Sequence, residues 1–197
     1  MILRDTKLRN ELYELSKKYK DIEDIILFGS VVRGKDKPKD IDVLVIFKLR
    51  IDKEIELKIR KIIQEKYNNL SIISKTSKTV LDPSFDARES ILFEGISLLS
   101  VENVAQKYGY SPIGMFKYVF PKWNNLQKTK FYHALNGRKG GKGIAQKLNS
   151  IKIADNLIIV PLDKIEEFKS FLEFWNLQYV YIPTLIPERL NKNKILS

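Results

Sequence analysis

Residues 25–47 constrain the fold more than any other part of this sequence, because two apolar runs flank a turn rich in glycine and charge. The first run, residues 25–28, has the length and the composition of a buried strand. Gly29 and Ser30 end it, and the second run, residues 43–47, predicts another strand. The sequence therefore predicts a unit of strand, turn and strand with small residues at the bend.

Polar groups gather at both ends of this turn. A strand that passes through Gly29 and Ser30 into a helical turn aims backbone N–H groups and a hydroxyl at one point, which suits phosphate oxygens. Asp40 and Asp42 flank Ile41 at the start of the second run, so strand alternation predicts that both carboxylates lie on one face. Two such ligands suit Mg²⁺, which takes the rest of its shell from water and substrate phosphates.

These residues resemble the nucleotidyltransferase superfamily that includes DNA polymerase beta, especially its small stand-alone members. The family pattern is Gly-Ser after an apolar residue, a spacer of about ten residues, then acid-apolar-acid on a strand. The resemblance implies that Gly29 and Ser30 hold the outer phosphates of a nucleoside triphosphate such as ATP, and that Asp40 and Asp42 are catalytic and hold Mg²⁺ or Mn²⁺. A hydroxyl would then attack the α-phosphate and expel pyrophosphate. Arg33, in the basic turn, is a further candidate for binding the triphosphate.

The sequence departs from the family at the third carboxylate, which the pattern places on a later strand. Residues 70–73 predict that strand, and the expected acid is replaced by Ser71, which cannot replace a carboxylate as metal ligand or accept a proton near neutral pH. Three interpretations follow. The chain is a single-metal enzyme, or another acid substitutes for the missing one, or the fold binds nucleotide without transferring it. The substitute acids considered are Asp82, Asp86 and Glu94.

The periodicity of the chain predicts an α/β (α+β) protein of two domains. The resemblance implies that residues 1–99 form a nucleotidyltransferase-fold domain with a mixed sheet and flanking helices, and the pattern of the second half predicts that residues 100–197 form a basic α/β C-terminal domain. Amphipathic patterns predict helices at residues 5–20, 51–67 and 86–94 in the first domain and at 123–135, 144–149 and 163–175 in the second. Further strands are expected at 95–99, 157–160 and 178–182. Pro183, Pro187 and the end of the chain are expected to be loosely ordered.

Basic residues dominate the second half. The formal net charge is +11, of which residues 101–197 contribute a surplus of 8. Residues 103–154 contain ten basic and no acidic side chains, interleaved with aromatic residues. This pattern favours contact with RNA or DNA; an anionic small molecule or an acidic protein partner is the alternative. The candidate nucleic-acid-binding residues are Lys117, Lys122, Lys128, Lys130, Arg138, Lys139, Lys142 and Lys147.

The segment from Ser100 to Val119 has two interpretations. Ser100 as an N-cap, a turn at Gly109 and Pro112 opening the next segment resemble a helix-turn-helix. The aromatic-rich residues 115–120 are also compatible with a strand.

Composition bounds the remaining possibilities. The chain has no cysteine, so disulfides and thiol-ligated zinc are excluded. It has no signal-like N-terminus and no apolar run that approaches the ~18 residues of a membrane span, so we expect a cytoplasmic protein without membrane contact. The expected activity is transfer of a nucleoside monophosphate to a hydroxyl acceptor. The alternatives are a non-catalytic nucleotide- or nucleic-acid-binding protein on a degenerate fold, and an antitoxin-type enzyme that modifies a protein hydroxyl.

Overall fold

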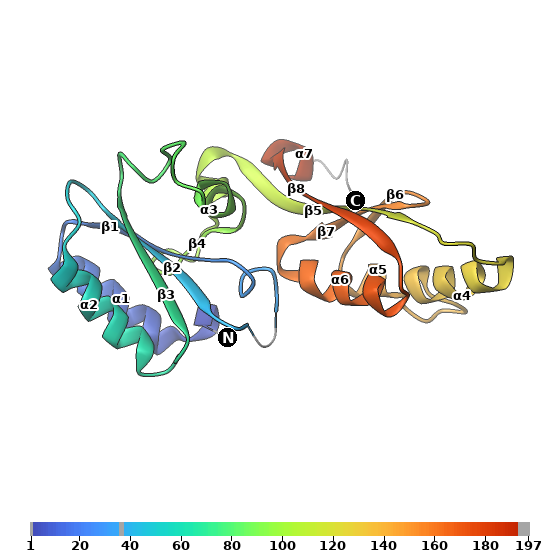
Figure 1. Cartoon of the computed structure of the whole chain (residues 1–197), viewed down its shortest axis with the longest axis horizontal. Helices are drawn as coiled ribbons and strands as arrows, with labels where there is room; N and C mark the ends of the chain where they lie inside the picture. The colour runs from blue at the N-terminus through green and yellow to red at the C-terminus, as the bar shows by residue number, and fades with distance from the viewer. Residues whose placement is uncertain (1, 36–37, 193–197) are drawn as a thin grey trace. The chain divides into compact units, whose positions relative to one another are not determined.

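The computed structural model describes residues 2–35 and 38–192, with side chains described as far as residue 190. The chain divides into two compact units, Met1–Tyr108 and Gly109–Ser197 (Figure 1). The sequence prediction put the boundary between residues 99 and 100. Residues 100–108 instead join the first unit, where Asn103 forms a β-bridge with Ile96 and the Val104 amide donates to the Gly95 carbonyl.

The first unit contains a four-stranded mixed sheet. Its strands are β1 (Ile22–Phe28), β2 (Ile41–Phe47), β3 (Leu70–Thr76) and β4 (Ile96–Ser97), in the order β3-β2-β1-β4. β1 is antiparallel to β2 and to β4, whereas β2 and β3 are parallel and are connected through a helix. The predicted mixed α/β fold of this part is confirmed.

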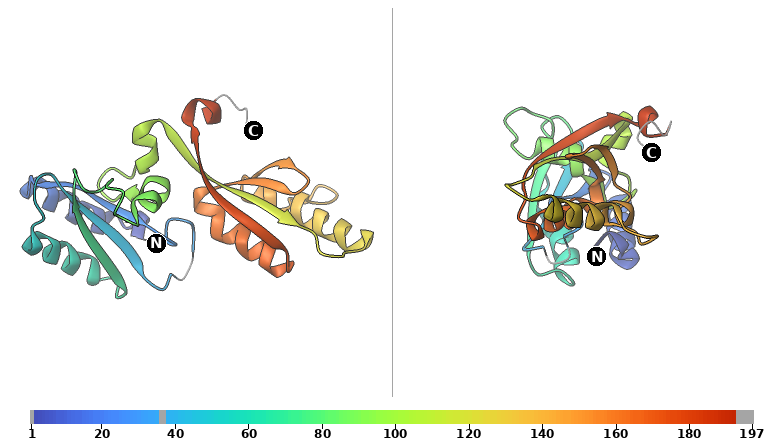
Figure 2. Two further views of the ribbon diagram at one scale, coloured as in Figure 1. Left: turned by 45° about the horizontal axis from the view of Figure 1, so that its top comes forward. Right: turned by 90° about the vertical axis from the view of Figure 1, so that its right-hand side faces the viewer.

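Helices cover both faces of this sheet (Figure 2). Helices α1 (Thr6–Lys18) and α2 (Lys53–Gln64) each begin after an aspartate N-cap, at which Asp5 accepts from the Leu8 amide and Asp52 from the Ile55 amide. Each helix buries one apolar stripe, as the periodicity predicted. The short helix α3 (Arg88–Glu94) packs on the other face, and the 3₁₀ helices are η1 (Ile2–Arg4) and η2 (Val104–Tyr108).

A small apolar cluster packs α3 against one face of the sheet. Its members come from β1, β2, the segment before α3, α3 itself and η2, and they are Ile26, Phe28, Leu44, Ile46, Phe85, Ile91 and Val104. Strand alternation then places Asp42 on the same face of β2 as Leu44 and Ile46. Helix α3 therefore packs on the same face of the sheet as Asp42.

The second unit contains a separate antiparallel sheet. Its strands are β5 (Tyr110–Val119), β6 (Ile151–Ala154), β7 (Leu157–Pro161) and β8 (Gln178–Pro187), in the order β6-β7-β5-β8. The helices are α4 (Asn125–Asn136), α5 (Ile144–Lys147), α6 (Ile165–Phe174) and α7 (Glu188–Lys192), with the 3₁₀ helix η3 (Leu162–Lys164). Helices α4, α5 and α6 lie on one side of this sheet (Figure 1).

Aromatic side chains fill the core between this sheet and its helices. Phe116 and Tyr118 on β5 are fully buried, with Phe131 on α4 and Phe168 on α6. The rings of Phe116 and Phe168 meet edge to face at 5.0 Å, and those of Tyr118 and Phe131 at 5.5 Å. Of the eight aromatics interleaved with the basic residues of 103–154, Phe116, Tyr118 and Phe131 therefore belong to the buried core, whereas Tyr108 and Tyr110 are exposed.

The structure decides between the two interpretations of residues 100–119 and contradicts one other expectation in this unit. Residues 110–119 form strand β5, so the strand interpretation holds and the helix-turn-helix interpretation does not; Ser111 and Pro112 lie inside this strand. Pro183 and Pro187 are not in a loose tail, because β8 continues through both as an edge strand paired with β5. Residues 193–197 lie outside the described residues. None of the helices in the part of the chain that the structure describes has the length and apolarity needed to cross a membrane.

Candidate functional site

The bend between β1 and β2 starts at Gly29, whose φ of +84° is a left-handed conformation that favours glycine. The amides of Val32 and Arg33 donate to the Gly29 carbonyl, and the Lys35 amide donates to the Ser30 carbonyl. The chain thus makes the predicted helical turn directly after the strand. Ser30 is half-buried, and its hydroxyl has no hydrogen bond with another described residue.

Asp42 lies against this bend. In the antiparallel ladder Asp42 is opposite Phe28, the last residue of β1. A Cβ atom added to Gly29 would lie 2.6 Å from Oδ2 of Asp42, which is far inside normal contact. The carboxylate therefore occupies the space that a side chain at position 29 would need. This observation places one predicted acid directly beside the predicted phosphate-binding turn.

The second predicted acid is close to the first. Asp40 is exposed and immediately precedes β2, while Asp42 is half-buried. Burial raises the pKa of Asp42, and the negative charges of Asp40 and Glu94 raise this pKa further. A hydrogen bond with Ser71 and the charge of Arg33 oppose this rise. Negative charge is thus concentrated at the predicted cation site.

Ser71 stands directly beside Asp42. Strand β3 runs parallel to β2, and the ladder aligns Ser71 with Asp42. The Ser71 side chain forms a hydrogen bond with Asp42 that acts to lower the pKa of the aspartate. The sequence placed the missing carboxylate at this strand, and the structure has a hydroxyl there instead.

Glu94 is the only one of the three considered substitute acids for which a contact with the bend is seen. Its side chain is 4% exposed; Oε1 accepts from the Gly29 amide at 3.0 Å, and Oε2 accepts from Nη1 of Arg33 at 2.5 Å. Asp82 instead accepts hydrogen bonds from Ser84, and both Asp82 and Asp86 are exposed. The sequence named Glu94 as a substitute acid but did not include it among the site residues.

The contacts of Glu94 connect α3 to the bend. Glu94 ends α3, 65 residues after Gly29 in the chain. Because its carboxylate is bonded to Arg33 and to the Gly29 amide, it stabilises the turn in one conformation. In this conformation the Gly29 N–H group already donates its hydrogen bond to Glu94. Of the predicted phosphate-binding residues, Ser30 and Arg33 are therefore the two that would bind a phosphate through their side chains.

The donor set fits a divalent cation that shares its shell with a substrate. The described residues contain no group of three or more His, Cys, Asp or Glu side chains that could hold a metal by itself. Mg²⁺ does not need such a group, because it usually retains waters and is bound through one or two carboxylates and substrate phosphates. Asp40 and Asp42 would hold it; the pKa of Asp42 is raised by burial and then by the negative charges of Asp40 and Glu94, and a cation would relieve this charge repulsion.

We predict that an Asp40→Asn substitution lowers the pKa of Asp42 in the metal-free protein, because it removes the stronger of two like charges. Since the folded pKa of Asp42 lies above the ordinary value of 3.8, the folded chain binds this proton more tightly than the unfolded chain. Asp42 therefore contributes stability below that ordinary value, and the contribution is lost as the pH rises through the folded pKa.

The measurement is a titration of the Asp42 carboxyl carbon by NMR. Asp86→Asn, which removes an exposed acid that does not act on Asp42, is the matched control. An Asp42 pKa that is the same in wild type and in Asp40→Asn would mean that the two carboxylates do not share a site.

All the predicted nucleic-acid-binding residues lie in the second unit. One is on β5, two are on α4, one is on α5, and the others are in connecting segments. Lys128 is half-buried near the Phe120 ring and the other seven are exposed. No ion pair with an acid of the described residues is found for any of the eight, which are Lys117, Lys122, Lys128, Lys130, Arg138, Lys139, Lys142 and Lys147.

Comparison with known proteins supports the interpretation of the first unit. The family model described as "Polymerase beta, Nucleotidyltransferase" matches residues 10–99. This range includes the bend after β1, both aspartates, Ser71 and Glu94. A search of curated proteins found no match.

Proposed function

Because residues 10–99 form a nucleotidyltransferase domain of the polymerase beta superfamily, we propose that this chain transfers a nucleoside monophosphate from a nucleoside triphosphate to a hydroxyl acceptor. The proposal includes Mg²⁺ or Mn²⁺, held by Asp40 and Asp42. It also includes binding of the triphosphate by the turn that begins at Gly29.

The residues of the turn have distinct tasks in this proposal. The Ser30 hydroxyl and the guanidinium of Arg33 bind outer phosphate oxygens, because the first is a free donor and the second is a cation. Glu94 keeps Arg33 and the turn in place through its two hydrogen bonds. Gly29 leaves room for the Asp42 carboxylate beside the turn.

The reaction is a displacement at the α-phosphorus. A bond forms between the acceptor oxygen and that phosphorus, the bond to the bridging oxygen of pyrophosphate breaks, and the acceptor proton is released to a carboxylate or to water. A bound divalent cation supplies neutralisation of phosphate charge and orientation of the triphosphate. The contribution of the chain is to position the reactants, since phosphoryl transfer of this kind needs little covalent chemistry from the protein.

The observation that carries this proposal is the approach of Asp42 to Gly29. The 2.6 Å between Oδ2 and a would-be Cβ puts a carboxylate beside the first residue of the turn. Asp42 would hold a divalent cation beside this turn, and the cation would neutralise charge on a triphosphate bound there. If the two aspartates were ordinary solvated charges at a strand edge, nothing would require Asp42 to lie this close to Gly29.

The proposal is tested by incubating the full chain with each α-labelled nucleoside triphosphate, with Mg²⁺ or Mn²⁺, and with bulk RNA, DNA or protein. Label that appears in one acceptor class supports transfer and identifies the acceptor. Label in the protein fraction alone supports the antitoxin-type alternative. The absence of label from every fraction, with all four triphosphates and both cations, overturns transfer.

A second candidate function is nucleotide binding without transfer. The alignment of Ser71 with Asp42 favours it, because the hydroxyl cannot supply the base or the metal ligand expected at that strand. The engagement of Glu94 by Arg33 favours it as well, since the nearest substitute acid is already bonded. Isothermal titration of Mg²⁺ and triphosphate separates the two candidates. Binding of both without label transfer supports the second candidate.

A further inference from the structure

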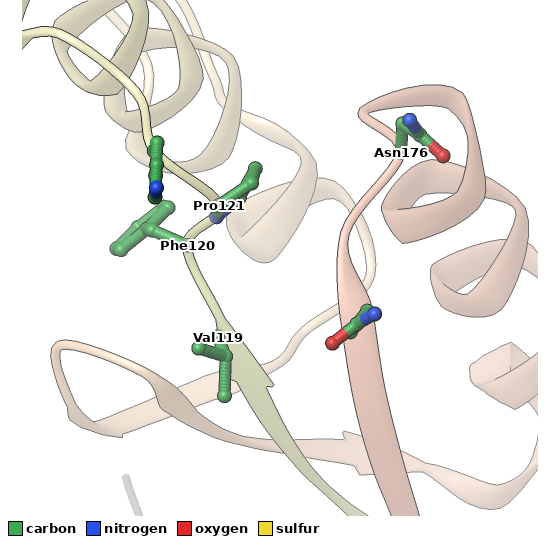
Figure 3. Close-up of a pocket in the computed structure, with 6 residues that line it drawn as sticks. Val119, Phe120, Pro121 and Asn176 are labelled. Atoms are coloured by element: carbon green, nitrogen blue, oxygen red, sulfur yellow. The ribbon is translucent and has the colours of Figure 1, made fainter.

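A cavity of about 430 Å³ lies at one end of the sheet in the second unit. Figure 3 shows that Val119, Phe120 and Pro121, where β5 ends, form one wall, and that Asn176 comes from the turn after α6. Lys122 and Gln178 complete the lining. Val119 and Gln178 are the last pair of the β5–β8 ladder, so the cavity opens where these two strands separate.

The lining combines apolar surface with neutral hydrogen-bonding groups. Val119, Phe120 and Pro121 supply the apolar part, and no carboxylate of the described residues lines the cavity. Asn176 and Gln178 each carry a carboxamide, which donates and accepts hydrogen bonds. Neither carboxamide has a hydrogen bond with another side chain or backbone group of the described residues. A flat ligand with an apolar face and a polar edge matches this combination.

The backbone conformation explains why position 176 is an asparagine, but it does not explain why position 178 is a glutamine. Asn176 has a φ of +53°, and asparagine tolerates this conformation better than most residues. Its amide donates to the Glu173 carbonyl, and the Leu177 amide donates to the Leu172 carbonyl, so the end of α6 is satisfied by backbone groups. The side chain of Asn176 is therefore not needed as a cap. Gln178 is an exposed strand residue, and the local structure does not require a glutamine at this position.

A series of aromatic contacts leads from Phe120 in the cavity lining to an exposed ring. The Phe120 ring lies 5.5 Å from that of Trp123, and Trp123 lies 6.0 Å from Trp175. Trp175 in turn contacts Phe174, which is 84% exposed. Burial in the core cannot explain a phenylalanine in that position. Exposed rings of this kind serve as platforms on which nucleobases stack.

Positive charge surrounds these groups. Lys122 lines the cavity, Lys117 lies on β5 two residues before Val119, and Lys128 lies 6.0 Å from the Phe120 ring centre. None of the three has an ion pair with an acid among the described residues. Cations without ion-pair partners suit the phosphates of a nucleic-acid strand, because neutralising those phosphates releases counterions from the strand.

We propose that this cavity accepts an unpaired nucleobase of a single-stranded nucleic acid, with Asn176 and Gln178 bonding the base edge and the surrounding lysines holding the phosphates. A base in a duplex cannot enter, because its edge is paired and its faces are stacked. Single-stranded nucleic acid would then be the acceptor class for the transfer proposed above, so this inference rests on the proposed function and extends it. Strand binding itself requires neither nucleotide nor metal.

The test is fluorescence anisotropy of the full chain with labelled 12-mers, in EDTA and without nucleotide, so that failure of the transfer reaction has no influence on it. The ligands are single-stranded RNA, single-stranded DNA, the corresponding duplex, and a 12-mer of abasic sugar-phosphate. We expect the single strands to bind more tightly than the duplex and than the abasic strand. The two single strands distinguish RNA from DNA.

The variants separate the base site from general charge attraction. Asn176→Gly, which keeps the backbone conformation, and Gln178→Ala remove the carboxamides, and Phe174→Ala removes the exposed ring. Each is expected to weaken single-strand binding by about five- to a hundredfold. The matched controls are Gln146→Ala, an exposed glutamine on α5, and Leu126→Ala, an exposed apolar residue on α4. Both controls are expected to bind as wild type does.

Three outcomes would overturn the proposal. They are equal affinity for duplex and single strand, equal affinity for abasic and ordinary strands, and pocket variants that bind like the controls. Each would mean that the lysines attract phosphates without a base site. Failure of every 12-mer to bind would remove nucleic acid as the ligand altogether. Circular dichroism of each variant excludes loss of folding as the cause of a reduced affinity.

Discussion

Asp42→Asn is expected to reduce nucleotidyl transfer by at least about a hundredfold, because it removes a negative charge from the proposed cation site while keeping the shape of the side chain. Metal-assisted charge neutralisation contributes several kcal/mol, and each 1.36 kcal/mol corresponds to a factor of ten in rate. The measurement is the initial rate of label transfer at saturating triphosphate, together with isothermal titration of Mg²⁺. We expect both the rate and the Mg²⁺ affinity to fall.

The fold of this variant is expected to survive. Ionisation of Asp42 is opposed by burial and by neighbouring negative charge, so the neutral amide does not remove a favourable charge interaction that the fold depends on. Asp86→Asn is the control, because it removes an acid that is exposed and outside the site. If Asp42→Asn transferred label at the wild-type rate, the proposed cation site would be wrong, whatever the activity of the chain.

Gly29→Ala is the second change for which we expect a large effect. An alanine at this position adopts a left-handed backbone at a cost of about 1–2 kcal/mol. Its Cβ atom would also lie 2.6 Å from Oδ2 of Asp42, so the carboxylate or the turn has to move. Overpacking of this kind costs about 1–3 kcal/mol more. We expect a loss of unfolding free energy in urea and a loss of triphosphate binding.

The chain offers a close control for the backbone part of this effect. Gly140 has a φ of +83°, against +84° for Gly29, but a Cβ atom there would meet nothing within 4 Å. Gly140→Ala therefore carries the conformational cost without the contact. The difference between the two variants in urea unfolding measures the contact with Asp42. Equal destabilisation by both variants would contradict the close approach of Asp42 to the turn.

The first unit was largely predictable because its signals are local. Two apolar runs around Gly29 and Ser30 predicted strands β1 and β2; the structure pairs them antiparallel and lengthens both at their starts. The expected third strand and its serine are also present, since residues 70–76 form β3. Each of these features depends on residues that are near one another in the chain.

The choice of Glu94 among the candidate acids was not predictable for the opposite reason. Its approach to the turn depends on β4 pairing with β1 and on α3 packing against Ile26 and Leu44. Nothing within the local sequence distinguishes Glu94 from Asp82 or Asp86. Only the tertiary arrangement brings its carboxylate to the Gly29 amide.

The second unit was harder to predict for two physical reasons. Tyr110–Val119 carries both turn residues and aromatics, so local propensity left helix and strand open; pairing with β7 and β8 decides in favour of a strand. The cavity depends on the meeting of Val119 and Gln178, which are far apart in the sequence. The positive charge of the second half of the sequence predicted a polyanionic ligand, but it did not predict where a nucleobase would bind.

Strand β8 limits how other chains can associate with this protein. An edge strand normally offers a row of free amides to which a foreign strand can add. In β8 Pro183 and Pro187 have no N–H group, so this row is interrupted. Extension of the sheet by an incoming peptide, or by a neighbouring copy in an aggregate, is therefore disfavoured along this edge. Recognition along the β8 edge then depends on side chains rather than on main-chain pairing.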